Sequence, residues 1–157
     1  MTVTVSIDRT PTMTAISTAH ASLLDLRIPI RLAVQGVTDP LIVPLWFEYR
    51  DERLWCASQA DSRCVRALRR AGRCAFDIST NDMPYRGLRG TASVICDASL
   101  GAAQLDRLLQ RYLGGLDSPL ARRLRRRADN EVAVILEPVR VSHWDYAARM
   151  RGSLPVT

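Results

Sequence analysis

Alternating hydrophobic and polar positions, interrupted by turn residues, predict β-strands along most of this chain. Residues 30–36, 40–50 and 53–58 are rich in branched and aromatic side chains, with turn residues between them. Further strands are predicted at 73–79, 88–98, 131–138 and 140–146. The short connections between many of these segments favour antiparallel pairing.

Apolar residues recur every three to four positions over 101–113, which predicts an amphipathic helix that ends at Gly114–Gly115. The apolar stripe consists of Leu105, Leu108, Leu109, Tyr112 and Leu113. A second helix is predicted at about 117–128 and a short one at 18–27, where Thr18 can act as the N-cap.

Another short helix is predicted to follow the strand at 53–58. Asp61 or Ser62 can cap its first turn, and the helix should run to Arg70 because Gly72 follows as a terminator. Val65 and Leu68 would form its buried side.

The length and composition are those of one globular domain. The chain has 157 residues, of which 47% are hydrophobic and 24% charged. We expect a mainly β (α+β) fold: a small barrel of six to seven antiparallel strands with flanking helices. This domain should span residues 18–150, after a flexible N-terminal arm at 1–17 and before a C-terminal tail at 151–157.

All 22 basic residues are arginine, and the net charge is +6. This excess favours anionic partners such as phosphates, acidic cofactors or nucleic acid. The densest run, Arg122–Arg127, is either a solvated helix face or a nucleic-acid contact. No apolar run is long enough to span a bilayer and no secretory signal is visible, so we expect a cytoplasmic protein without a membrane partner.

The cysteines do not have the spacing of a metal site. Cys56, Cys64, Cys74 and Cys96 include no CxxC pair, and the two histidines lie far from them in sequence. We therefore predict no metal, and interpret the three strand cysteines, Cys56, Cys74 and Cys96, as small core residues. Familiar nucleophile and nucleotide-binding motifs are also missing from the sequence.

One group of residues is suited to an anion. Ser58 ends a predicted strand, and Ser62, Arg63 and Arg66 lie at the start of the next helix. A helix N-terminus has unpaired N–H groups and a partial positive charge, so a phosphate would be stabilised there. The alternative is that Ser62 only caps the helix and that water solvates the arginines.

Pro44 interrupts a predicted strand. Because proline has no N–H to donate to a neighbouring strand, Pro44 indicates a sheet edge, a bulge, or backbone left open to a ligand.

In this order, the motifs resemble the pyridoxamine 5′-phosphate oxidase-like superfamily of flavin-binding split β-barrels, particularly its branch of small flavin and deazaflavin oxidoreductases. The resemblance covers about residues 28–97 and 131–146. Its motifs are PLIVPLWFEYRDERLWCAS, DSRCVRALRRAGRCAFDI, PYRGLRGTASV and VILEPVRVSHWDY.

The resemblance implies a split-barrel homodimer with two cofactors in grooves between the protomers. It implies that the backbone of Pro44, Leu45 and Trp46 flanks the flavin ring. The phosphate would be held by Ser58, Ser62, Arg63 and Arg66, together with position 64, where Cys64 stands in place of a common family lysine. Tyr85 and Arg86 would line the substrate rim.

The sequence thus predicts an oxidoreductase that acts on a small organic substrate. Its cofactor would be FMN or, alternatively, the 8-hydroxy-5-deazaflavin coenzyme (F-420), and no residue is assigned as catalytic. The alternatives are a non-catalytic cofactor carrier and, less favoured, a basic nucleic-acid-binding protein. A further hypothesis makes Cys64 a reactive thiol, since helix N-termini and arginines lower thiol pKa values.

Overall fold

A computed structural model describes residue 16 and residues 20–151. The predicted arm apart from residue 16, the Thr18 cap and the tail beyond 151 lie outside the described residues. The strands are β1 (Ile30–Gln35), β2 (Pro40–Leu45), β3 (Phe47–Arg50), β4 (Arg53–Gln59), β5 (Arg73–Ser79), β6 (Arg86–Asp97) and β7 (Glu131–Asp145). The helices are α1 (Ala21–Leu24), α2 (Arg63–Ala71), α3 (Gly101–Leu113) and α4 (Pro119–Arg125), with a 3-10 turn, η2, at Ala128–Asn130.

All seven strands form one antiparallel sheet in the order β2-β1-β5-β6-β7-β4-β3. The two outermost strands, β2 and β3, are consecutive in the chain and are joined through Trp46 alone. The sheet must therefore curl until these two edges approach each other, which produces an open barrel. The structure confirms the predicted mainly β fold with flanking helices.

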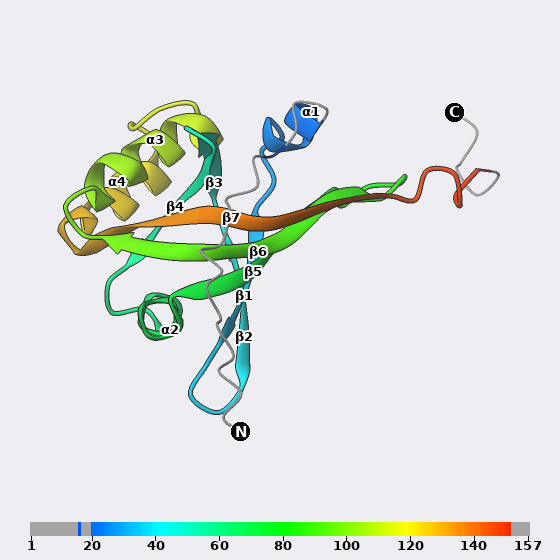
Figure 1. Ribbon diagram of the computed structural model, residues 1–157. Coiled ribbons are helices and arrows are strands. Elements are labelled where there is room, and N and C mark those ends of the chain that lie inside the picture. Colours follow the sequence, from blue (N-terminus) through cyan, green and yellow to red (C-terminus); the bar gives the residue numbers. More distant parts are fainter. Residues whose placement is uncertain (1–15, 17–19, 152–157) are drawn as a thin grey trace, which may run out of the picture.

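The core fills the inside of this curled sheet. Alternate residues of β1, such as Leu32 and Val34, are buried there, and so is Phe47 at the start of β3. Helix α2 covers one opening of the barrel with Val65 and Leu68, both completely buried. Helices α3 and α4 lie together on the outside of β4 and β7 (Figure 1).

The structure changes four predicted elements: it divides one strand, joins two strands and shortens one helix. Residues 40–50 form two strands because the chain turns from one sheet edge to the other at Trp46. The strands predicted at 131–138 and 140–146 form one strand, β7, because the extra residue Val139 is accommodated as a bulge opposite β6. The helix predicted at 117–128 spans only Pro119–Arg125, because Ser118 caps its start and the chain enters the 3-10 turn soon after its end.

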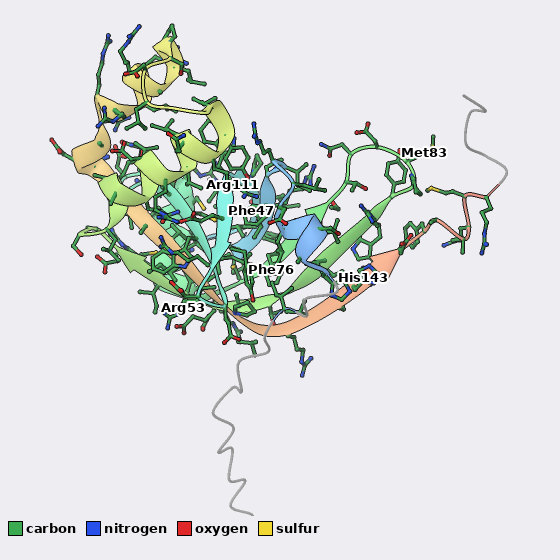
Figure 2. All side chains as sticks on the ribbon, turned by 90° about the horizontal axis from the view of Figure 1, so that it is seen from above. Phe47, Arg53, Phe76, Met83, Arg111 and His143 are labelled. Carbon is green, nitrogen blue, oxygen red and sulfur yellow. The ribbon has the colours of Figure 1, made fainter. Side chains whose placement is uncertain are left out.

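The helix predicted at 18–27 is a single turn, Ala21–Leu24. The backbone beyond it bonds to α3 instead of continuing a helix. Arg111 Nη2 donates to the carbonyls of Leu24 (2.6 Å) and Leu26 (3.0 Å), and the Tyr112 hydroxyl donates to that of Ile28 (2.9 Å). Figure 2 shows Arg111 beside Phe47. The central carbon of the Arg111 guanidinium lies 5.8 Å from the centroid of the Phe47 ring. These tertiary bonds take carbonyls that a longer helix would have used.

The ends of β5, β6 and β7 extend to one side as a three-stranded ribbon, in which Gly87 of β6 pairs with both Ser79 of β5 and Trp144 of β7 (Figure 1). The His143 ring on this ribbon stacks on His20, just before α1, with 4.3 Å between ring centroids. The ribbon carries Tyr85 and Arg86 at its far end, away from the start of α2.

Candidate functional site

The start of α2 is built as the sequence predicted. Ser62 is the N-cap, and its hydroxyl oxygen accepts the Val65 N–H at 3.1 Å. The Ser58 hydroxyl at the end of β4 lies 3.2 Å from that of Ser62. Because one hydroxyl hydrogen suffices for this contact, the second remains available to a ligand.

Two guanidinium groups lie beside this cap and are exposed to solvent. Arg66 Nη1 donates to the Asp61 carbonyl at 2.8 Å, while Arg63 has no hydrogen bond or ion pair with another described residue. Both line a cavity of about 130 Å³ against the turn between β1 and β2, together with Arg70 and the carboxyl-bearing Asp39. The positive charge is therefore concentrated on the first turns of α2, where the cap uses the Val65 N–H and leaves the Arg63 and Cys64 amides for a ligand.

Cys64 faces the opposite way, into the barrel. Its side chain is only 4% exposed, and it lies among the other three cysteines, which come from β4, β5 and β6. Burial raises the pKa of the Cys64 thiol to about 11 and that of Cys74 to about 12. The reactive-thiol hypothesis is therefore wrong, because the folded environment disfavours the thiolate.

These thiols should make the fold sensitive to alkali. A group whose pKa is raised on folding stabilises the folded state below its unfolded pKa, and that contribution is lost as pH rises through the folded pKa. For Cys64 this window runs from about 9 to about 11. We expect the loss of unfolding free energy over that range, measured by urea titration, to be smaller in Cys64→Ala than in the parent. An equal loss in both proteins would contradict this prediction.

Pro44, Leu45 and Trp46 lie where β2 leaves the sheet edge. The edge location predicted from Pro44 is confirmed, since β2 has only β1 as a neighbour. The three residues line a cavity of about 400 Å³ beneath α3 and α4, completed by Pro29, Ala57, Leu105, Leu108, Leu124 and Glu131. The Trp46 side chain stacks almost parallel on Tyr112, with 4.9 Å between ring centroids, so only part of the residue is open to a ligand.

Tyr85 and Arg86 lie at the tip of the three-stranded ribbon, where the β5–β6 loop enters β6. The Tyr85 carbonyl accepts the Tyr146 N–H at 2.9 Å, and the Arg86 N–H is donated to the Thr80 hydroxyl at 3.1 Å. Arg86 lines a third cavity, of about 550 Å³, next to Met83. Six of the predicted site residues are thus divided among three cavities, whereas Ser58, Ser62, Cys64 and Tyr85 line none of these three.

A surface feature that sequence reasoning missed lies on the outer face of the sheet. Ile42 on β2 is 75% exposed, and it adjoins exposed Ala33 and Ala75 on β1 and β5 across the register of the sheet. These residues form the apolar part of a broad depression of about 570 Å³, which is also lined by Arg31, Asp77, Arg89 and Arg140. The alternation along β1, β2 and β5 could have indicated this surface, because small or apolar residues occupy some of the outward positions of these strands as well as the inward ones.

The arginine run is partly paired. Arg125 bonds to Asp106 at 2.8 Å and Arg127 to Asp61 at 3.3 Å, whereas the side chains of Arg122 and Arg123 have no described partner. Within residues 20–151 no group of three or more His, Cys, Asp or Glu side chains is arranged to hold a metal ion. No described helix is long and apolar enough to cross a membrane.

No protein-family profile matches the chain, and no curated protein matches it in sequence. Many solved structures are similar in fold. Rv2991 from Mycobacterium tuberculosis, a conserved hypothetical protein, has a TM-score of 0.69 and 20% identity, with 97% of this chain and 96% of that chain covered. An F420 reductase has a TM-score of 0.68 and 22% identity, with coverage of 81% and 98%.

Two further similar structures bear other names. A candidate pyridoxamine 5′-phosphate oxidase from Listeria innocua has a TM-score of 0.61 and 14% identity, with coverage of 80% and 94%. HutZ, a heme storage protein from Vibrio cholerae, has a TM-score of 0.62 and 11% identity, with coverage of 84% and 95%. At these identities the likeness concerns the fold. The chain therefore has the split β-barrel fold of the pyridoxamine 5′-phosphate oxidase-like superfamily, as its sequence motifs predicted.

Proposed function

We propose that this protein is a homodimeric oxidoreductase that binds FMN, or a deazaflavin coenzyme in its place, and acts on a small organic substrate. The observation that carries the proposal is the start of α2, where two serine hydroxyls lie 3.2 Å apart and the first turn of the helix carries two exposed arginines. The fold supports it too, since an F420 reductase and a candidate pyridoxamine 5′-phosphate oxidase are built in the same way.

The residues present fit a phosphate group. A phosphate dianion needs several N–H and O–H donors and compensating positive charge. The free hydroxyl hydrogen of the Ser58–Ser62 pair, the Arg63 and Cys64 amides and the Arg63 guanidinium supply both. Cys64 contributes its backbone N–H at most, because its side chain is buried in the core.

The ring-binding residues call for a second copy of the chain. Pro44, Leu45 and Trp46 line a different cavity from Arg63 and Arg66, so a single protomer presents the two halves of the predicted site separately. The apolar outer face around Ile42 would cost free energy if it stayed in water, and burying one such side chain stabilises by about 1.5–3 kcal/mol. We place the dimer contact on this face, adjoining edge strand β2.

Within this proposal the cofactor supplies the hydride or electron chemistry, and the protein binds and orients it. The serines and arginines at α2 hold the phosphate. The backbone of Pro44, Leu45 and Trp46 flanks the ring and, with the partner protomer, excludes water. Tyr85 and Arg86 on the ribbon form the substrate rim.

A non-catalytic carrier is the second candidate, since a heme storage protein shares the fold. The test is to mix the purified protein with FMN or with the deazaflavin coenzyme, desalt it, and record the visible absorbance. The proposal expects one of them to be retained in a 1:1 ratio with the chain and to exchange electrons with a panel of small oxidants and reductants. Retention without turnover favours the carrier, and retention of neither contradicts the proposal.

A further inference from the structure

The cavity between the β2–β3 bend and helices α3 and α4 contains one ionisable residue. Eight of its nine lining residues are apolar or proline, and the ninth is Glu131, the first residue of β7. Glu131 is only 6% exposed. A carboxyl group so deeply buried costs free energy unless something compensates for its charge, so its surroundings determine what it can do.

The Glu131 side chain points toward this cavity. Glu131 is paired with Gln59 on β4, and Ala133 is paired with Ala57, so these four side chains lie on one face of the sheet. Ala57 lines the same cavity. Glu131 therefore projects between the sheet and the two helices, on the side where Leu105 and Leu124 complete the lining.

Only one of its oxygens has a partner. Gln59 Nε2 donates to Glu131 Oε1, and Gln59 is held in that orientation because Asn130 Nδ2 donates to its Oε1 at 3.0 Å. Glu131 Oε2 has no hydrogen-bond partner among the described residues, and it stays open to water because it is not one of the fully buried atoms that lack a partner. The nearest positive charge, on Arg127, is itself paired with Asp61 at 3.3 Å.

The electrostatic surroundings of Glu131 fit a carboxyl group that has only one hydrogen-bonded oxygen. Burial raises the pKa of the Glu131 carboxyl, although the Gln59 bond and the charge of Arg127 act in the opposite direction. A positively charged or N–H donor group of a ligand would remove the cost of burial that raises it.

We infer that this cavity is a substrate subsite separate from the rim at Tyr85 and Arg86, that it takes an apolar amine, and that the Glu131 carboxylate binds the nitrogen of that amine. In placing a substrate here the inference rests on the proposed function, because Pro44, Leu45 and Trp46 line the cavity from the side where the cofactor ring would lie. A volume of about 400 Å³ holds a small aromatic or aliphatic amine. The apolar walls bind the hydrocarbon part, and Glu131 selects for the nitrogen.

The test uses 2-phenylethylamine and, as its charge-reversed counterpart, 3-phenylpropanoate, titrated into the full chain by calorimetry. We expect the amine to bind and the carboxylate not to. Glu131→Gln keeps the size of the side chain and should weaken amine binding at least tenfold. Glu137→Gln, on the same strand but outside the cavity, should leave it within twofold.

A second variant tests the cavity without touching the Gln59–Glu131 bond. Leu124→Trp fills the space from α4 and should also weaken amine binding at least tenfold. Three results would overturn the inference. The parent and Glu131→Gln could bind the amine with equal affinity, the parent could bind 3-phenylpropanoate as tightly as the amine, or the parent could bind no amine. Retention of FMN and of the deazaflavin coenzyme is measured in each variant. If the parent retains neither of them but shows Glu131-dependent amine binding, the proposed function is refuted and the amine site stands.

Discussion

Replacing both Arg63 and Arg66 by alanine is expected to weaken FMN binding at least a hundredfold while leaving the melting temperature of the cofactor-free protein nearly unchanged. Each charge-assisted hydrogen bond to a phosphate contributes about 1.5–3 kcal/mol, so two lost bonds correspond to about two to four powers of ten in affinity. Both side chains are exposed, and Arg66 makes only one bond to the protein, to a backbone carbonyl. FMN fluorescence quenching on titration measures the affinity.

The matched control is Arg122→Ala combined with Arg123→Ala on α4. That pair removes the same charge from two exposed arginines that have no described side-chain partner. If retention depends on the start of α2, this control keeps FMN affinity within about threefold at 0.15 M salt, where distant charges are screened. Equal losses in both double variants would mean that overall positive charge, and not the α2 site, attracts the cofactor.

Ile42→Arg is expected to convert the proposed dimer into a monomer at micromolar concentrations. The substitution replaces an exposed apolar side chain of the depression by a charge, on a face that Arg31, Arg89 and Arg140 already line. Burying an unpaired charge costs several kcal/mol, so the dissociation constant should rise by about a hundredfold or more. Sedimentation velocity at several protein concentrations measures the fractions of monomer and dimer.

Leu100→Arg is the control, because Leu100 is 40% exposed at the start of α3 and lies outside the depression. It should sediment like the parent. Because the proposed cofactor site needs both protomers, Ile42→Arg should also lose FMN, while Leu100→Arg retains it. A parent protein that is monomeric at every concentration would refute the dimer. A dimer that survives Ile42→Arg would move the contact to another face.

Local signals in the sequence were sufficient for much of the fold. The alternation in β1 and β5, the leucine stripe of α3 and the serine cap of α2 each involve residues within a few positions of one another. Their structural effect depends on backbone geometry that neighbouring residues share, so a single chain segment carries the information. The order of these motifs also sufficed to predict the split barrel.

The composition of the site depended on distant parts of the chain. Cys64 occupies a position where the family has a lysine, and nothing near it in sequence reveals that three other cysteines surround it inside the barrel. Trp46 gave no local sign that it would stack on Tyr112, which is 66 positions away. Glu131 looked like an ordinary strand-starting residue until the register of β4 and β7 placed it under α3 and α4.

The physical reason is the range of the interactions involved. Periodicity, caps and turn residues act over one to four positions, so they could be read in sequence order. Burial, charge compensation and cavity shape arise only after the sheet curls and brings β2 next to β3, with α3 and α4 packed outside. The strands, the cap and the arginines of α2 could therefore be predicted from the amino-acid sequence. The folded chain alone determined that Cys64 is inert, that Ile42 is exposed, and that one carboxyl group faces an apolar cavity.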